Sequence, residues 1–161
     1  MERLIINTGV KSYQVNDNGA VLRFSPSDSG MYARFLRLMD LVEDVSKDLE
    51  EKYKKAKLED GSDVNIDDEG TKAFAIAFEE ADKKIKAELT KVFGEKLNND
   101  FDAIFDGVNA FSVTDTGESV VTNFLNAVQP LIEASVNDHV KNKAKSQAAA
   151  ISKAKAKRGK K

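Results

Sequence analysis

Few side chains in this sequence are of the types that most often carry out covalent chemistry. The 161-residue chain has no cysteine, which excludes disulfides, thiolate metal sites and cysteine nucleophiles. Its one histidine, His139, would have to serve any catalytic triad or histidine-based metal site, and it lies just before a lysine-rich segment. We interpret His139 as a solvated residue near the end of a helix.

An acidic stretch at residues 59–70, EDGSDVNIDDEG, has some of the spacing of a calcium-binding loop. Asp63, Asn65 and Asp67 match the first three ligands of an EF-hand. Asp68 stands where the loop requires glycine, however, and Phe74 stands where it requires a bidentate glutamate. We therefore interpret this stretch as a solvated linker between helices.

Paired carboxylates occur at Glu79-Glu80 and at Asp100 and Asp102. Acid–base chemistry of the glycosidase kind needs two carboxyl groups facing each other in a cleft, one of them with a raised pKa, and nothing in the pattern predicts such a cleft. The phosphate-binding and nucleophile motifs GxxxxGK[ST], GxGxxG and GxSxG are missing from the sequence. The sequence therefore predicts no enzyme, no metal and no cofactor.

The charges divide the chain into two parts. The net charge is −2, but residues 141–161 hold nine Lys or Arg and no Asp or Glu, which leaves 16 basic and 27 acidic side chains in residues 1–140. An acidic body with a basic tail of this kind suggests an interaction segment. We expect residues 141–161 to be a flexible Lys/Ala-rich tail, because Ile151 is its only large apolar residue.

The basic tail admits more than one partner. Lys153, Lys155, Lys157 and Arg158 could neutralise phosphates, but the tail has no aromatic residue for base stacking and the body is acidic. We therefore favour contact with an acidic protein surface, including another copy of this chain, over nucleic acid. A membrane-surface role is disfavoured because the tail lacks bulky apolar anchors. No apolar run has the length of a spanning helix, and the N-terminus does not resemble a secretory signal.

The elements that must position these side chains begin with a β segment at residues 2–24. Leu4, Ile5 and Ile6 form a short strand-like run. We expect a two- or three-stranded antiparallel meander with turns near Thr8-Gly9 and Asn18-Gly19. So small a sheet needs a helix to cover its apolar face.

A helix-start signal, Ser25-Pro26-Ser27-Asp28, follows the β segment. Asp28 could instead cap a helix that begins one turn later, and Gly30 allows a short turn before it. Large apolar residues then recur every three or four positions from Met31, which predicts a helix to about Leu58. The inward positions are Met31, Tyr32, Phe35, Leu38, Met39, Leu41, Val42, Val45 and Leu49.

Further helices are predicted from Thr71 to about Gly94, over a short segment capped near residues 98–100, and over residues 118–140, where Pro130 should kink or divide the helix. In that last helix Leu131 is among the positions expected to face inward. The predicted fold is mainly α with a small N-terminal hairpin (α+β), a bundle of three main helices and a short one. Residues 1–140 would form one domain, with β structure in 2–24 and helices in 25–140.

Phenylalanines recur along the predicted helices. Most should be in the core, but so small a fold should leave some on an exposed groove that binds a helix or another copy. The candidate partner-binding residues are Phe74, Phe78, Phe101, Phe105 and Phe124.

The order of these elements resembles that of tail assembly chaperones from the tail modules of long-tailed phages and prophages. The similarity is carried by INTGVKSYQVNDNG and VLRFSPSD, by the following YARFLRLMDLVED, and by FDAIFDG at residues 101–107. It covers roughly residues 3–107. The longer helix after Gly117 and the lysine-rich tail depart from the family pattern.

The resemblance implies a non-enzymatic function in the cytoplasm of a bacterial host. Proteins of that type bind the tape measure protein and keep it soluble while tail tube subunits polymerise around it. The alternatives are a structural virion component, such as a head-completion or minor tail protein, and a nucleic-acid-associated protein that acts through the basic tail.

Overall fold

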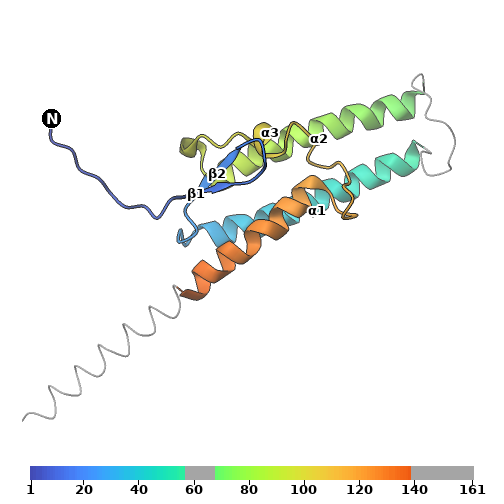
Figure 1. Cartoon of the computed structure of the whole chain (residues 1–161). Coiled ribbons are helices and arrows are strands. Elements are labelled where there is room, and N and C mark those ends of the chain that lie inside the picture. The colour runs from blue at the N-terminus through green and yellow to red at the C-terminus, as the bar shows by residue number, and fades with distance from the viewer. Residues whose placement is uncertain (57–67, 139–161) are drawn as a thin grey trace, which may run out of the picture.

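The computed structural model describes residues 1–56 and 68–138, which form a mainly helical α+β fold (Figure 1). A hairpin of β1 (Lys11–Gln14) and β2 (Val21–Phe24) precedes the helices α1 (Met31–Lys55) and α2 (Glu69–Phe93). A 3₁₀ turn, η2 (Glu95–Leu97), and the short α3 (Phe101–Ile104) follow. A further helix, which we call the C-terminal helix, occupies residues 120–138. The predicted fold class is confirmed.

The two strands pair in antiparallel fashion, with Lys11 opposite Phe24 and Tyr13 opposite Leu22. The predicted turn near Asn18-Gly19 is confirmed: Gly19 has a φ of +81°, and the Asn16 side-chain oxygen accepts hydrogen bonds from the backbone N–H groups of Asn18 and Ala20, each at 3.1 Å. Leu22 and Phe24 on β2 are buried, so the hairpin contributes one face to the core.

The chain before β1 forms no third strand. Residues 1–10 extend away from the body in Figure 1. Leu4, Ile5 and Ile6 are 86%, 75% and 73% exposed. Of the two predicted forms of the sheet, the two-stranded one is therefore observed, and the apolar run is left uncovered.

The helix-start signal does not place the first residue of α1 at Pro26. Residues 25–28 form a turn closed by the Asp28 N–H on the Ser25 carbonyl, and the helix begins at Met31 with Gly30 as its N-cap. The Asp28 carboxylate accepts a hydrogen bond from the Gly30 N–H at 2.9 Å and pairs with Arg34 at 2.6 Å. The hydrogen bond from Arg34 holds the pKa of Asp28 below its ordinary value. The alternative of a short turn before the main helix is confirmed.

Helices α1 and α2 lie side by side and run in opposite directions (Figure 1). Met31, Phe35, Leu38, Val42 and Leu49 of α1 are buried, as the helical spacing predicted. Helix α2 begins two residues before the predicted Thr71, because Asp68 acts as its N-cap and accepts from the Thr71 N–H at 3.1 Å. This cap gives Asp68 a structural role at the position where a calcium loop would need glycine. The helix ends at Gly94, whose φ is +120°.

The elements after α2 cover the open side of the helix pair. Asp100 caps α3 through hydrogen bonds from the backbone N–H groups of Asp102 and Ala103. Asp106 and Gly107 have positive φ and stop the helix. The C-terminal helix continues through Pro130 in the described residues, so of the two predicted effects of Pro130 the division of the helix is wrong, while a kink stays a prediction. Leu131 is 38% exposed, which corrects its predicted inward position.

The ring of Phe93, at the end of α2, lies at the centre of the core. Its centroid is 5.3 Å from that of Phe24 on β2, 6.0 Å from that of Phe101 on α3 and 5.4 Å from that of Phe124 on the C-terminal helix. Edge-to-face and tilted aromatic pairs of this kind contribute about 0.5–1.5 kcal/mol each beyond the burial of their area. One side chain therefore connects α2 with three other elements.

Replacing Phe93 by leucine should lower the free energy of unfolding by about 1–3 kcal/mol, because the apolar volume is largely kept while three ring contacts are lost. Urea denaturation followed by circular dichroism measures the change. Leu36→Ala, at a position that is 44% exposed on α1, is the control and should cost less than about 0.5 kcal/mol. Equal losses in the two variants would contradict a central role for Phe93.

Candidate protein-binding grooves

The structure separates the five candidate phenylalanines into two groups. Phe101 and Phe105 are only 3% and 5% exposed, because they pack on each other and on Phe124 with ring centroids 5.5–5.9 Å apart. These two residues belong to the core and offer a partner almost no side-chain surface. Phe74, Phe78 and Phe124 are partly buried and line grooves. The tail candidates Lys153, Lys155, Lys157 and Arg158 lie outside the described residues, as does His139.

A groove of about 600 Å³ lies between α1, α2 and the loop that precedes the C-terminal helix. We call it the aromatic groove. Its apolar lining is Leu49, Tyr53, Phe74, Phe78, Phe111 and Val113. The Tyr53 and Phe74 ring centroids are 5.5 Å apart, and those of Phe74 and Phe78 are 5.7 Å apart. Three aromatic rings in series therefore form one continuous surface.

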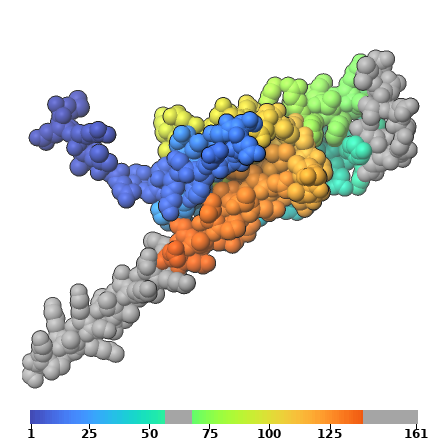
Figure 2. Space-filling view, viewed as in Figure 1, coloured from blue at the N-terminus to red at the C-terminus, as the bar shows by residue number. Residues whose placement is uncertain are grey.

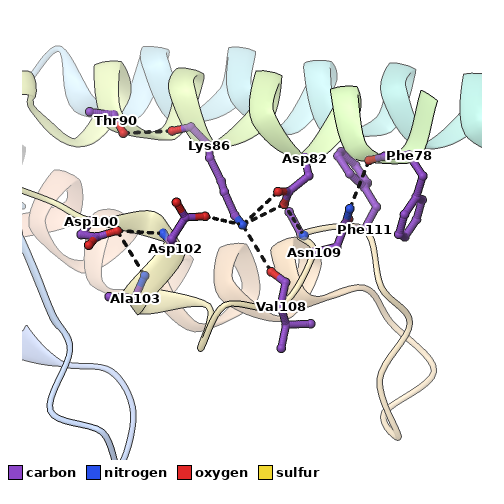
Figure 3. A network of polar contacts seen from close by, with 11 residues as sticks. Phe78, Asp82, Lys86, Thr90, Asp100, Asp102, Ala103, Val108, Asn109 and Phe111 are labelled. Carbon is purple, nitrogen blue, oxygen red and sulfur yellow. Dashed lines mark hydrogen bonds and ion pairs between the residues drawn. The ribbon is translucent and has the colours of Figure 1, made fainter. Parts of the chain in front are cut away.

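The far wall of this groove is fixed to α2 by polar contacts (Figure 3). The Asp82 carboxylate accepts a hydrogen bond from the Ala110 N–H at 2.7 Å. The Asn109 side chain donates to the Phe78 carbonyl at 3.1 Å and accepts from the Phe111 N–H at 2.9 Å. Phe111 is thereby held opposite Phe78, and the groove is preformed.

Lys86 extends this network toward α3. Its Nζ atom lies 3.0 Å from Asp82, 2.8 Å from Asp102 and 3.4 Å from the Val108 carbonyl, as Figure 3 shows. The Lys86 side chain is 12% exposed. Burial alone would lower the pKa of Lys86, but the hydrogen bonds and charges of Asp102 and Asp82 outweigh it, so the pKa is raised. Lys86 therefore stays protonated at neutral pH and acts as a clamp between α2, α3 and the loop.

A second groove, of about 420 Å³, lies beside the hairpin. We call it the hairpin groove. Its lining comes from three places: Tyr13, Val15 and Leu22 of the hairpin, Ile104 and Phe105 at α3, and Val120, Phe124, Val128 and Leu131 of the C-terminal helix. Val15 and Leu131 are 36% and 38% exposed, so this apolar groove is open to solvent.

The carboxylates singled out from the sequence do not meet in either groove. Glu79 forms an exposed pair with Lys83 at 3.1 Å, and its neighbour Glu80 is also exposed. Asp100 caps α3 and Asp102 pairs with Lys86. Across residues 1–56 and 68–138, no three metal-ligating side chains come together. Asp63, Asn65 and Asp67 lie outside that range.

Comparison with protein-family models, with curated proteins and with solved structures gives no match to this chain. Among the helices that the structure describes, none is both long enough and apolar enough to cross a membrane.

Sequence reasoning missed several residues of the aromatic groove and its wall. Tyr53 and Val113 were not among the candidates, and Asn109 carried no signal of its own. Asp82 and Lys86 are four residues apart on one helix, so their ion pair could have been predicted from the sequence. The contacts of Lys86 with Asp102 and of Asp82 with Ala110 join residues 16 and 28 positions apart, and no local pattern encodes them.

Replacing Lys86 by methionine should lower the free energy of unfolding by about 1–3 kcal/mol, since Asp82 loses a charged partner in a largely buried position. Lys83→Met is the matched control on the same helix. Its pair with Glu79 is 74% and 68% exposed and should contribute no more than about 0.5 kcal/mol. Thermal or urea unfolding measures both, and a Lys86→Met variant as stable as Lys83→Met would contradict the clamp.

Proposed function

We propose that this protein is a non-enzymatic tail assembly chaperone of a long-tailed phage or prophage. It binds the tape measure protein, tail tube subunits or both in the cytoplasm of a bacterial host. The observation that carries the proposal is the aromatic groove, because a preformed apolar groove between helices suits an amphipathic helix of another polypeptide. The order of elements that resembles that family adds support.

The groove has the properties of a site for apolar side chains. Tyr53, Phe74 and Phe78 present partly buried rings, and Val113 at the rim is 74% exposed. Each large apolar client side chain that leaves water in this groove contributes about 1.5–3 kcal/mol. The entropic cost of association offsets part of this gain. Two or three such side chains should therefore give binding that is reversible. Reversible masking of an aggregation-prone client is what a chaperone must achieve.

Charge adds selectivity to this surface. Glu50 and Glu118 line the aromatic groove, and residues 1–140 carry 27 acidic and 16 basic side chains. A client helix with lysines or arginines beside its apolar face would be attracted at long range, and the acidic body keeps the complex dispersed. Binding should therefore weaken as the salt concentration rises, while the contribution of apolar contacts to the binding free energy remains.

The two alternatives predict different locations of the protein. A structural virion component remains in finished particles in fixed stoichiometry, whereas a chaperone leaves before completion. A nucleic-acid-associated protein would act through residues 141–161, which lie outside the described residues. Mass spectrometry of purified particles distinguishes a virion component from a chaperone. Measuring nucleic-acid binding with and without residues 141–161 tests the second alternative.

Co-expression with a tape measure protein tests the proposal. The unmodified chain should keep that client soluble and co-purify with it. A Phe74→Ser/Phe78→Ser variant should reduce co-purification at least tenfold, because two rings of the groove are removed. Val113→Asp should do the same without touching the core, since this side chain is exposed at the rim.

Leu36→Ser is the matched control, because this exposed leucine on α1 lines none of the grooves described above. It should leave co-purification unchanged. Circular dichroism confirms that each variant is folded. A client that is equally insoluble with and without this protein, or equally well bound by folded groove variants, would overturn the proposal.

A further inference from the structure

The first ten residues form an arm that carries a short apolar run, Leu4-Ile5-Ile6. In Figures 1 and 2 the arm leaves the hairpin and points away from the body. Leu4, Ile5 and Ile6 are at least 73% exposed. Isoleucine is among the residues that favour strands, and three consecutive large apolar side chains in water are costly. The sequence of the arm therefore favours a β-strand, but in this structure the arm pairs with no other strand.

The hairpin has the complementary feature, an open edge. The Val15 N–H bonds to the Ala20 carbonyl, so by the alternation of an antiparallel ladder Tyr13 and Lys11 also face β2. The backbone N–H and C=O groups of Ser12 and Gln14 must then point to the other side of β1. Ser12 and Gln14 are exposed, and the described residues give their outward backbone groups no hydrogen-bond partner.

The opposite edge of the hairpin, on β2, is covered at one residue, Arg23. Asn99 accepts a hydrogen bond from the Arg23 N–H and donates one to the Arg23 carbonyl, both at 2.8 Å. One side-chain amide thus takes the place of a neighbouring strand at the position of Arg23. An exposed strand edge without such cover is a template for pairing with another chain.

The hairpin groove lies beside the open edge. It is lined by the consecutive residues Tyr13, Gln14 and Val15 but by a single residue of β2, Leu22, which places it on the β1 side. Figure 2 shows the hairpin lying next to the C-terminal helix on this face, and Phe124 and Leu131 of that helix form the other wall. A strand added to β1 would direct alternate side chains into this apolar groove.

The arm is held away from the open edge of its own β1. Thr8 is bound through its carbonyl by the Ser25 hydroxyl at 2.9 Å, and Ser25 directly follows β2. Gly9 turns there with a φ of +74° and lies against the side chains of Ser25 and Ser27. The base of the arm is therefore fastened on the β2 side of the hairpin, which leaves the β1 edge free for a strand from elsewhere.

We propose that the arm of one copy adds as a third strand to the β1 edge of a second copy. Its apolar side chains then occupy the hairpin groove of that second copy. Reciprocal exchange of two arms gives a closed dimer with two-fold symmetry. The exchanged strand forms hydrogen bonds with the outward backbone N–H and C=O groups of Ser12 and Gln14. Depending on the register, either Leu4 and Ile6 together or Ile5 alone enters the groove. This inference is independent of the aromatic groove and of any client.

Sedimentation velocity of the full chain over a range of micromolar concentrations tests the exchange. The unmodified chain should form a dimer. Leu4→Asp/Ile5→Asp/Ile6→Asp should weaken dimerisation at least 100-fold, because it charges the arm in either register. Ser12→Pro should also weaken dimerisation, because it removes an outward N–H from the β1 edge that receives the arm. The hydrogen bonds of Tyr13 and Lys11 to β2 remain. Leu36→Asp, an equivalent change on α1, should leave the dimer intact.

Hydrogen exchange of the same samples identifies the segment that pairs. Amides of residues 4–7 should be protected in the dimer and should lose protection on dilution. A chain that is monomeric at every concentration overturns the proposal, and so does a dimer that survives the Leu4→Asp/Ile5→Asp/Ile6→Asp change. A monomer with a protected arm would show pairing within one chain and would also overturn it.

Discussion

The packing of Phe93 against three other rings is the contact on which the arrangement of this protein depends. Helices α1 and α2 bury their apolar faces against each other, but the hairpin, α3 and the C-terminal helix are too small or too separate to be placed by that contact. Phe24, Phe101 and Phe124 bring one residue from each of them to the end of α2. Both grooves are therefore bounded by elements that this cluster aligns.

A second layer of order is polar and comes from side-chain hydrogen bonds and ion pairs between residues that are far apart in the sequence. Asp82 and Asn109 fasten the loop before the C-terminal helix to α2, Lys86 joins α2 to α3, and Asn99 covers the β2 edge at Arg23. Of the carboxylates that look like candidate chemistry, Asp100 caps α3 and Asp102 pairs with Lys86. Among the described residues, the aromatic groove, the hairpin groove and the arm are apolar surfaces that remain open to solvent.

Local patterns in the sequence were sufficient for the elements and insufficient for their assembly. Helical spacing predicted the buried face of α1, and Gly94, Asp100 and Gly19 predicted ends, caps and turns, because the physics at those positions is local. The burial of Phe101 and Phe105 and the exposure of Leu131 depend on which elements pack together, which spacing does not encode. The same holds for the arm: Leu4-Ile5-Ile6 has strand character, but the hydrogen bond from Ser25 to Thr8 keeps it off its own hairpin.

The central claim is that the aromatic groove binds an apolar segment of another polypeptide. Hydrogen exchange of the full chain, alone and saturated with a tape measure protein fragment, tests this most directly. The account predicts new protection in residues 46–53, 74–78 and 111–122, whose side chains line the groove, and little change in residues 31–38. Protection confined to other parts of the chain, or none on saturation, would contradict it.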